Sequence, residues 1–207
     1  MLMILALAPM LLGKPYTSLM PVFAKDVLHG GAKLQGLILT FVGIGGFAGA
    51  VVVASMRRQN AYALPVIVGA GAFGLALMGF SLSRWTLLSL VLGTVIGVFN
   101  VTYRTQNQTL LQVLAPDHLR GRVMSIYLLD KGLVPIGSLM AGALAESLGG
   151  PMALLIMSTA SVVVVLLVAL SSLSFVRLRV PLGGEAAHDY SKRQKGEANE
   201  KGIPPIV

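Results

Sequence analysis

Residues 34–54 read LQGLILTFVGIGGFAGAVVVA, a run of 21 residues that contains no charged side chain. Such a run is long enough to cross a bilayer as one helix, because hydrocarbon about 30 Å thick requires about 20 residues at about 1.5 Å each. Inside lipid the backbone must satisfy its own hydrogen bonds, which favours a helix over any open structure. The stretch therefore predicts a transmembrane helix.

Five further stretches, on both sides of this one, meet the same length and apolarity criterion. They are residues 2–24, 63–82, 86–103 with a polar continuation to 114, 123–145 and 152–176. The composition agrees, since 55% of the 207 residues are hydrophobic and only 12% are charged, about half the usual charged fraction. This composition disfavours a water-soluble fold. We expect an all-α membrane protein whose residues 1–176 form six transmembrane helices in the lipid bilayer.

Basic residues are divided unequally between the two predicted faces of the membrane. With six spans both termini share a face, and near the span ends that face carries Arg57, Arg58, Arg104, Arg120, Arg122, Arg177 and Arg179. The opposite face carries Lys25, Lys33 and Arg84. Because basic loops remain in the cytoplasm, we predict that both termini are cytoplasmic. The net charge of +8 is thus interpreted as membrane topology, and no nucleic-acid partner is expected.

The composition changes after residue 176. Residues 177–207 are rich in Gly, Pro, Glu, Lys and Asn and show no apolar period. A segment of this kind cannot bury enough surface to order itself. We expect a basic, disordered cytoplasmic tail, whose Lys192-Arg193-Gln194-Lys195 cluster either contacts anionic lipid or is simply solvated.

Two segments of the chain are similar to each other at an offset of 91 residues. Residues 21–31, PVFAKDVLHGG, align without gaps with residues 112–122, QVLAPDHLRGR, and five of the eleven positions are identical. The first segment follows the first predicted span and the second follows the fourth, which places them on opposite faces of the membrane. An inverted repeat of three plus three helices has this arrangement, and several secondary transporters are built from it. The repeat favours transport over simple anchoring.

Small residues are spaced four apart in two of the predicted helices. The pairs are Gly45 with Gly49, Gly46 with Ala50, Gly137 with Ala141, and Ser138 with Gly142. Such spacing lets two helices approach closely. The pattern is compatible with static packing and with helices that slide past each other during transport.

Lys14 lies inside the first predicted span. A charge at the centre of a membrane helix costs about 2.5 to 3.5 kcal/mol, so its presence requires a reason. Lys14 follows Gly13 and precedes Pro15, and we expect the helix to be kinked or interrupted there, close to the midplane. We predict that Lys14 faces a substrate cavity; a structural ion pair is the alternative.

A polar stripe is predicted on the fourth span and its continuation. Asn100, Arg104 and Asn107 or Gln108 recur at three- and four-residue spacing, with Gly97 above them. Such a stripe faces an aqueous cavity or another polar helix. The alternative is that Arg104 snorkels to the headgroup region, where the amides would also be solvated.

Asp130 is the one acid predicted to lie in the membrane far from a span end. A buried carboxylate with a raised proton affinity is suited to proton coupling. A structural ion pair with Lys131 or Lys14 is the competing interpretation.

The sequence lacks the patterns of a soluble enzyme. It contains no cysteine, and His29, His118 and His188 are not spaced as metal ligands. Neither a phosphate-binding Gly-x-x-x-x-Gly-Lys loop nor a Gly-x-Ser-x-Gly elbow occurs. We therefore expect no catalytic residue, metal or cofactor.

Residues 109–150, TLLQVLAPDHLRGRVMSIYLLDKGLVPIGSLMAGALAESLGG, closely resemble helices ten and eleven of bacterial major facilitator superfamily exporters. The branch concerned is that of the transmembrane secretion effectors, which includes enterobactin exporter-like proteins. The resemblance rests on Gln112, Pro116, the run 119–122, Pro135-x-Gly137-Ser138 and the stretch 142–145. Residues 15–50 likewise resemble helices seven and eight, and the resemblance covers about residues 1–176.

The resemblance implies one half of a larger fold. Members of this family have twelve helices in two six-helix halves, and this chain is similar to the second half alone. Either the sequence is a fragment, or it pairs with a separate first half or with a second copy of itself.

The resemblance also implies roles for particular residues. Lys14, Tyr16 and the stripe of Asn100, Arg104, Asn107 and Gln108 fall on helices that line the substrate cavity. Arg120 and Arg122 match a cytoplasmic loop that gates against the opposing half. Arg57 and Arg58 occupy a second such loop, although the full gating pattern of the superfamily is missing there.

The implied function is proton-coupled export of a small amphipathic molecule or siderophore across the bacterial inner membrane. The competing hypothesis is a non-transporting membrane fragment or accessory protein that packs against a partner.

Overall fold

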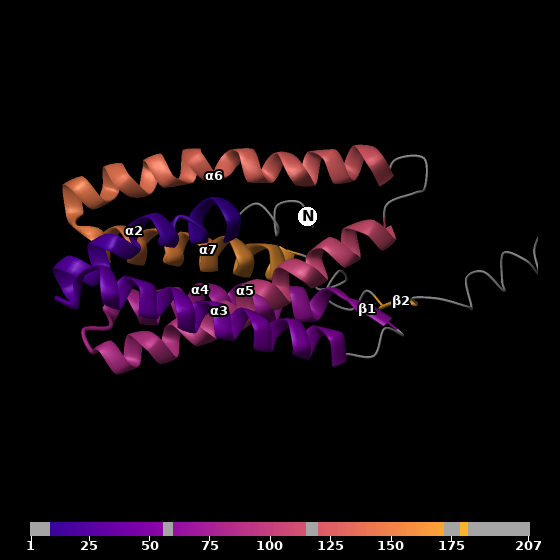
Figure 1. Ribbon diagram of the computed structural model, residues 1–207. Coiled ribbons are helices and arrows are strands. Elements are labelled where there is room, and N and C mark those ends of the chain that lie inside the picture. The colour runs from indigo at the N-terminus through magenta and orange to yellow at the C-terminus, as the bar shows by residue number, and fades with distance from the viewer. Residues whose placement is uncertain (1–8, 56–59, 115–119, 172–178, 182–207) are drawn as a thin grey trace, which may run out of the picture.

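The computed structural model describes residues 9–55, 60–114, 120–171 and 179–181, and these form a bundle of helices that run lengthwise beside one another (Figure 1). In chain order the elements are η1 Pro9–Gly13, α2 Tyr16–Val22, η2 Phe23–Val27, α3 Gly31–Ser55, β1 Asn60–Tyr62, α4 Ala63–Leu82, α5 Thr86–Leu114, α6 Arg120–Leu148, α7 Gly150–Ser171 and β2 Arg179–Pro181. The two η elements are π-helical turns, and together with α2 they form what we call the broken segment.

Four of the helices are long and apolar enough to cross a membrane. They comprise Gly31–Ser55, Pro65–Leu82, Thr86–Gln112 and Gly150–Leu170, and they confirm four of the six predicted spans to within a few residues. Helix α6 is continuous over the fifth predicted span, and Val134–Leu148 is an apolar stretch among those of its residues whose side chains are described. The remaining predicted span, residues 2–24, is described from Pro9 onward as the broken segment.

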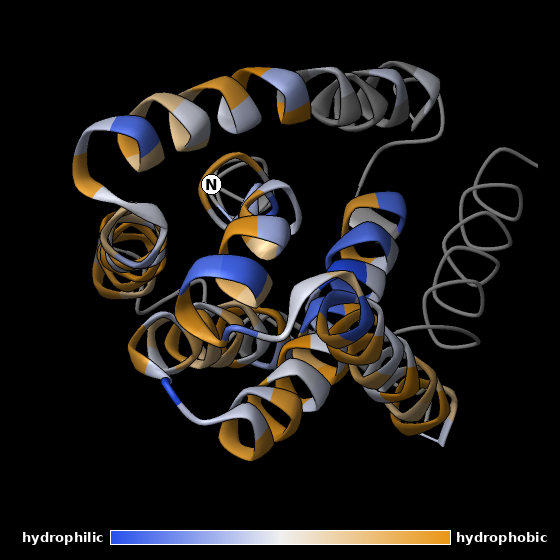
Figure 2. Cartoon of the chain, turned by 60° about the vertical axis from the view of Figure 1, so that its left-hand side comes forward, coloured by the Kyte–Doolittle hydropathy of each residue, from blue (hydrophilic) through white to orange (hydrophobic). Residues whose placement is uncertain are grey.

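Hydrophobic residues make up most of the helical ribbon (Figure 2). Large apolar side chains are exposed on its outside, among them Phe47, Trp85, Leu87, Leu139 and Leu170. Exposed apolar surface of this extent requires a non-aqueous surrounding. The helices and their surface agree with a multi-pass membrane protein.

The break in the first segment has a local cause. Pro15 has no backbone N–H, and its ring disfavours the helical hydrogen-bonding pattern of the preceding turn. The Lys14 N–H therefore donates to the carbonyl of Pro9 at 3.0 Å, and the Ser18 N–H donates to the carbonyl of Pro15 at 2.9 Å, so that neither bond has the α-helical spacing. Lys14 and Pro15 form a turn between η1 and α2. The predicted interruption at Lys14 is confirmed.

Helices α3 and α5 are in backbone contact through glycines. A Cβ atom at Gly45 of α3 would collide with the carbonyl oxygen of Thr94 on α5, and one at Gly49 would lie 2.6 Å from the carbonyl oxygen of Val98. On the facing surface, a Cβ atom at Gly97 of α5 would collide with the carbonyl oxygen of Val42. The predicted close approach at Gly45 and Gly49 is confirmed.

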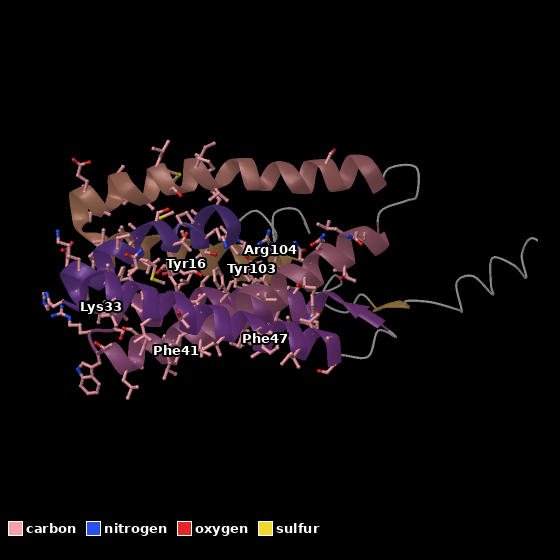
Figure 3. The ribbon with its side chains drawn as sticks, in the orientation of Figure 1. Tyr16, Lys33, Phe41, Phe47, Tyr103 and Arg104 are labelled. Carbon is pink, nitrogen blue, oxygen red and sulfur yellow. The ribbon has the colours of Figure 1, made fainter. Side chains whose placement is uncertain are left out.

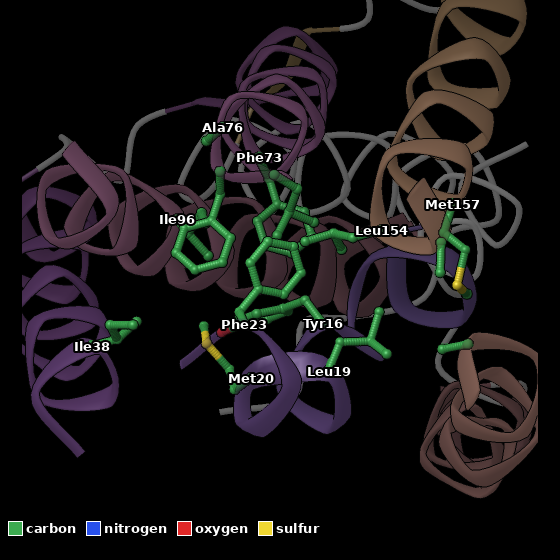
Figure 4. Close-up of a cluster of buried hydrophobic side chains, with 14 of the residues drawn as sticks. Tyr16, Leu19, Met20, Phe23, Ile38, Phe73, Ala76, Ile96, Leu154 and Met157 are labelled. Atoms are coloured by element: carbon green, nitrogen blue, oxygen red, sulfur yellow. The ribbon is translucent and has the colours of Figure 1, made fainter. Parts of the chain in front are cut away.

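Helix α4 lies between α5 and α7 and carries the centre of the core. Phe73 and Phe80 of α4 are almost fully buried, and the ring of Phe80 lies 5.1 Å from that of Phe23. Tyr16 and Met20 of α2 pack into the same cluster (Figure 4). The broken segment is thus held against the bundle by its apolar side chains.

A two-stranded antiparallel ribbon joins distant parts of the chain. Asn60 pairs with Pro181 and Tyr62 with Arg179, so β1, between α3 and α4, is bonded to β2, beyond α7. The sequence did not predict this pairing, since residues 179–181 belong to the segment expected to be disordered. The rest of that segment, residues 177–178 and 182–207, lies outside the described residues.

The glycine contact leads to a test of the fold. We expect Gly45→Ala to lower the stability of the protein by about 1 to 3 kcal/mol, because the added methyl group has no space against α5. Gly43→Ala is the matched control, since its Cβ atom would meet nothing within 4 Å. That control should be neutral or slightly stabilising because alanine favours the helix. Thermal unfolding in detergent measures both, and equal unfolding temperatures for the two variants would contradict the packing.

Candidate functional site

The residues of the predicted polar stripe on α5 differ in burial. Asn100 and Arg104 are half-buried and Gln108 is exposed, and these three lie four residues apart on one face. Asn107 is buried, with 1% of its surface exposed, on the face that also carries Tyr103. Gly97 does not belong to the stripe because it contacts α3 at Val42 and Gly46.

Lys14 and Arg104 lie on different parts of the fold. Lys14 occupies the turn between η1 and α2, and Arg104 lies on α5. Both side chains are half-buried. Among the described residues neither has an acidic partner, and the two acids whose side chains are described, Asp26 and Glu146, are exposed.

Three aromatic rings connect the elements that carry these two cations. The ring of Phe73 on α4 lies 6.3 Å from that of Tyr16, edge to face, and 5.5 Å from that of Tyr103. Tyr16 is two residues from Lys14, and Tyr103 precedes Arg104 (Figure 3). Tyr16 is therefore part of the buried support behind the cations, with 4% of its surface exposed.

The sequence did not single out Phe73 or Tyr103. The sequence pattern of an apolar helix does not distinguish an aromatic residue of the general core from one that supports a site. The position of Tyr103 next to Arg104, a predicted site residue, was the available indication of such a role.

The broken segment is also joined to α6. A Cβ atom at Gly137 would collide with the carbonyl oxygen of Leu11 and would lie 2.8 Å from Pro15, so the two backbones are close at the level of Lys14. The hydroxyl of Ser18 donates to that of Ser138 at 3.1 Å. Of the small residues predicted on this helix, Gly137 and Ser138 therefore pack against the element that carries Lys14, whereas a Cβ atom at Gly142 would meet nothing within 4 Å.

Several predicted residues fall outside the described part of the chain. Arg57 and Arg58 are among them. For Asp130, Arg120 and Arg122 the structure describes only the helical backbone of α6.

A pocket of about 330 Å³ opens at a different place. It is lined by Asp26, His29 and Arg84 among others, near the end of the broken segment and the connection between α4 and α5. Arg104 is far from it, 18 residues beyond Thr86 and thus about 27 Å along the helix. The pocket contains none of the predicted site residues.

Residues 1–198 match the family described as transmembrane secretion effectors, within the major facilitator superfamily of transporters. The chain belongs to this family. The match confirms the resemblance found in the sequence, and it agrees with the six helical segments and their apolar surface. A transporter family, rather than an enzyme family, is thereby identified.

One curated relative of this chain is the staphyloferrin A transporter of Staphylococcus aureus. The two are 30% identical over 146 residues, which cover 70% of this chain and 36% of the relative. The chain thus corresponds to about a third of the length of the protein that it matches.

The contribution of the three aromatic rings can be tested by truncation. We expect Phe73→Ala to lower the free energy of unfolding by about 3 to 5 kcal/mol, because the ring is fully buried and contacts both Tyr16 and Tyr103. Phe47→Ala is the control, since Phe47 is 74% exposed on α3. It should change stability by about 0.5 kcal/mol or less. Denaturant or thermal unfolding of the detergent-solubilised protein gives both values, and a small effect at Phe73 would argue against the ring cluster.

Proposed function

We propose that this chain forms a substrate-binding half of a secondary active exporter. It acts with another six-helix half, or with a second copy of itself, and moves a small amphipathic molecule or siderophore outward in exchange for protons. The observation that carries the proposal is that two basic residues, Lys14 at the break of the first segment and Arg104 of α5, lie on elements joined by the ring contacts of Tyr16, Phe73 and Tyr103. Charged groups inside an apolar membrane domain mark substrate or ion pathways.

The position of Arg104 favours a cavity over the snorkelling alternative. A snorkelling side chain would extend away from the bundle toward the headgroups. Arg104 is instead half-buried, and it follows Tyr103, which is buried against Phe73 of α4. Discontinuous helices are also the elements that line substrate sites in transporters of this general design.

The contacts between elements support the three-plus-three repeat. In such a repeat the broken segment corresponds to α5, α3 to α6, and α4 to α7. The contact of α3 with α5 then has its counterpart in a contact of α6 with the broken segment. The contact of α4 with α5 has its counterpart in a contact of α7 with the broken segment. All four contacts are present, together with that of α4 with α7, which maps onto itself. Repeats of this type provide the two similar halves that alternate in access.

The proposed function also assigns a proton-coupling residue, a cytoplasmic gate and an orientation in the membrane. Asp130 of α6 carries the exchanged proton, and Arg57, Arg58, Arg120 and Arg122 form a basic gate on the cytoplasmic side. Both termini face the cytoplasm, and the membrane is the bacterial inner membrane. The name of the S. aureus relative supports a siderophore as substrate class.

Transport by the chain tests this function. The chain is expressed alone and joined to a first half from a family member, and uptake of labelled staphyloferrin A is measured in inverted vesicles with an imposed proton gradient. We expect Lys14→Gln and Arg104→Gln each to reduce the uptake rate at least about tenfold, since a charge-assisted contact contributes about 1.5 to 3 kcal/mol. Lys33→Gln is the control because Lys33 is exposed at the far end of the bundle (Figure 3).

Proton coupling by Asp130 is tested by a separate measurement. Asp130→Asn should abolish uptake driven by the proton gradient and preserve exchange of labelled for unlabelled substrate, because exchange needs no net proton movement. If neither the chain alone nor the joined protein transports the probe, an accessory role that consists of packing against a partner is the better assignment.

A further inference from the structure

The pocket near the end of the broken segment lies where membrane-crossing helices begin and end. Asp26 and His29 line it from η2 and the turn that follows. Ser81 and Arg84 line it from the end of α4 and its connection to α5, and Pro151 lines it from the start of α7. Because α3, α4, α5 and α7 are the four helices that can cross a membrane, the pocket is at the level of the lipid headgroups.

Close contacts join the walls of this pocket. The ring of Phe23 in η2 lies 5.1 Å from that of Phe80 in α4. A Cβ atom at Gly150 would lie 2.7 Å from the side chain of Val22, so α7 begins directly against α2. The pocket volume of about 330 Å³ is at the lower end of the range of small-ligand sites, about 300 to 1,000 Å³. A small group that enters it finds walls that are already in place, which limits the entropic cost of binding.

Two opposite charges line the pocket without pairing. Among the described residues neither Asp26 nor Arg84 forms an ion pair, so the carboxylate and the guanidinium stand beyond ion-pair distance of each other. A ligand that is only an anion is repelled by Asp26, and one that is only a cation is repelled by Arg84. A ligand that carries an ammonium and an anionic oxygen a few atoms apart interacts favourably with both. The charges of the pocket therefore favour a zwitterion.

His29 has an unusual backbone conformation beside these charges. Its φ angle is +53°, in the left-handed region that glycine adopts without strain and that few other residues occupy. The turn is fixed by the N–H of Gly30, which donates to the carbonyl of Ala24 at 2.8 Å. A strained position of this kind points to a function for its side chain. An imidazole N–H is a suitable donor to an anionic oxygen that is bound at Arg84.

Apolar side chains next to the pocket are exposed. They are Leu82, which also lines the pocket, and Trp85 and Leu87 immediately beyond Arg84. Tryptophan is enriched at the boundary between hydrocarbon and headgroups, where its ring contacts both. Acyl chains that extend from a headgroup in the pocket have an apolar surface to lie against.

We propose that this pocket binds the headgroup of an aminophospholipid, with its phosphate at Arg84 and His29 and its ammonium at Asp26. A soluble phosphoamine carries the same two groups, and the exposed apolar side chains beside the pocket favour the lipid as their source. The inference goes beyond the proposed exporter function and does not depend on it, because none of the residues assigned to transport line this pocket.

Binding to the full chain in dodecyl maltoside, an uncharged detergent, tests the chemistry of the pocket. Phosphoethanolamine should raise the unfolding temperature in a saturable manner. An equimolar mixture of ethanolamine and inorganic phosphate should have a much smaller effect, because only the linked molecule engages both charges in one binding event. Asp26→Asn and Arg84→Gln should each weaken phosphoethanolamine binding about fivefold, at the upper end of the effect of one solvent-accessible charge pair.

Two exposed charges that do not line the pocket provide matched controls. Glu146→Gln removes an acid near the end of α6, and Lys33→Gln removes a base near the start of α3. Both variants should bind phosphoethanolamine as the unchanged chain does. A loss of binding in the controls equal to that in Asp26→Asn and Arg84→Gln would reduce the effect to net charge and overturn the proposal.

Lipids added to the same micelles identify the source of the headgroup. We expect phosphatidylethanolamine to raise the unfolding temperature and phosphatidylglycerol, which lacks the ammonium, to have little effect. Trp85→Ala should weaken phosphatidylethanolamine binding about threefold and leave phosphoethanolamine binding unchanged, because only the lipid has chains that contact the ring. A response to phosphoethanolamine without one to phosphatidylethanolamine would overturn the lipid assignment and identify a soluble phosphoamine as the ligand.

His29→Gly gives a readout of opposite sign in the two states. The ligand-free variant should unfold about 2 °C higher than the unchanged chain, because glycine adopts the positive φ angle without strain. The same variant should bind phosphoethanolamine about threefold more weakly, because the imidazole donor is lost. A purely structural role of His29 predicts no change in binding and would remove this residue from the site.

Two further results would overturn the proposal as a whole. One is an equal response to phosphoethanolamine and to the mixture of its two halves. The other is unchanged binding in both Asp26→Asn and Arg84→Gln. Either result leaves the exporter function standing, since that function is tested by transport through variants of other residues.

Discussion

The contact between α3 and α5 is made backbone to backbone, and it determines which way α5 faces. Gly45 and Gly49 on one helix and Gly97 on the other leave no space for a side chain between them. Because α4 covers a second face of α5, at Tyr103, the half-buried side chains of Asn100 and Arg104 lie between these two contacts. Gly97 lies about two turns from Arg104 along α5, and the glycine contact thus orients that residue without touching it. Without a strong hydrophobic force between helices in lipid, close packing of this kind provides much of the specificity.

The second constraint is the broken segment. A straight helix in this place would present Lys14 on a continuous surface, with its backbone carbonyls paired. The turn at Lys14 and Pro15 instead places a cation at the end of a π-helical turn, where the backbone is irregular. Irregular backbone at membrane depth is tolerated where protein covers it or where it lines a water-filled cavity. Here Gly137 of α6 covers one side of the irregular backbone.

Much of the architecture could be predicted from the sequence because the bilayer imposes a length of about 20 apolar residues on any helix that crosses it. The limits of α4, Ala63–Leu82, were predicted to the residue for this reason. The position of the break also followed from local chemistry at Pro15. What the sequence did not reveal depends on which helix packs where. Asn107 and Gln108 are neighbours in the chain, yet one is buried and the other exposed, because α4 covers one side of α5.

The β1–β2 ribbon has a consequence for the mechanics of the bundle. Since Asn60–Tyr62 is bonded to Arg179–Pro181, the chain from residue 60 to residue 181 is a closed ring that contains α4, α5, α6 and α7. The broken segment and α3 lie outside this ring, joined to it covalently at a single point. The broken segment and α3 can therefore move against the other four helices without breaking the β1–β2 pairing. A separation of α4 from α7, in contrast, would pull on this pairing.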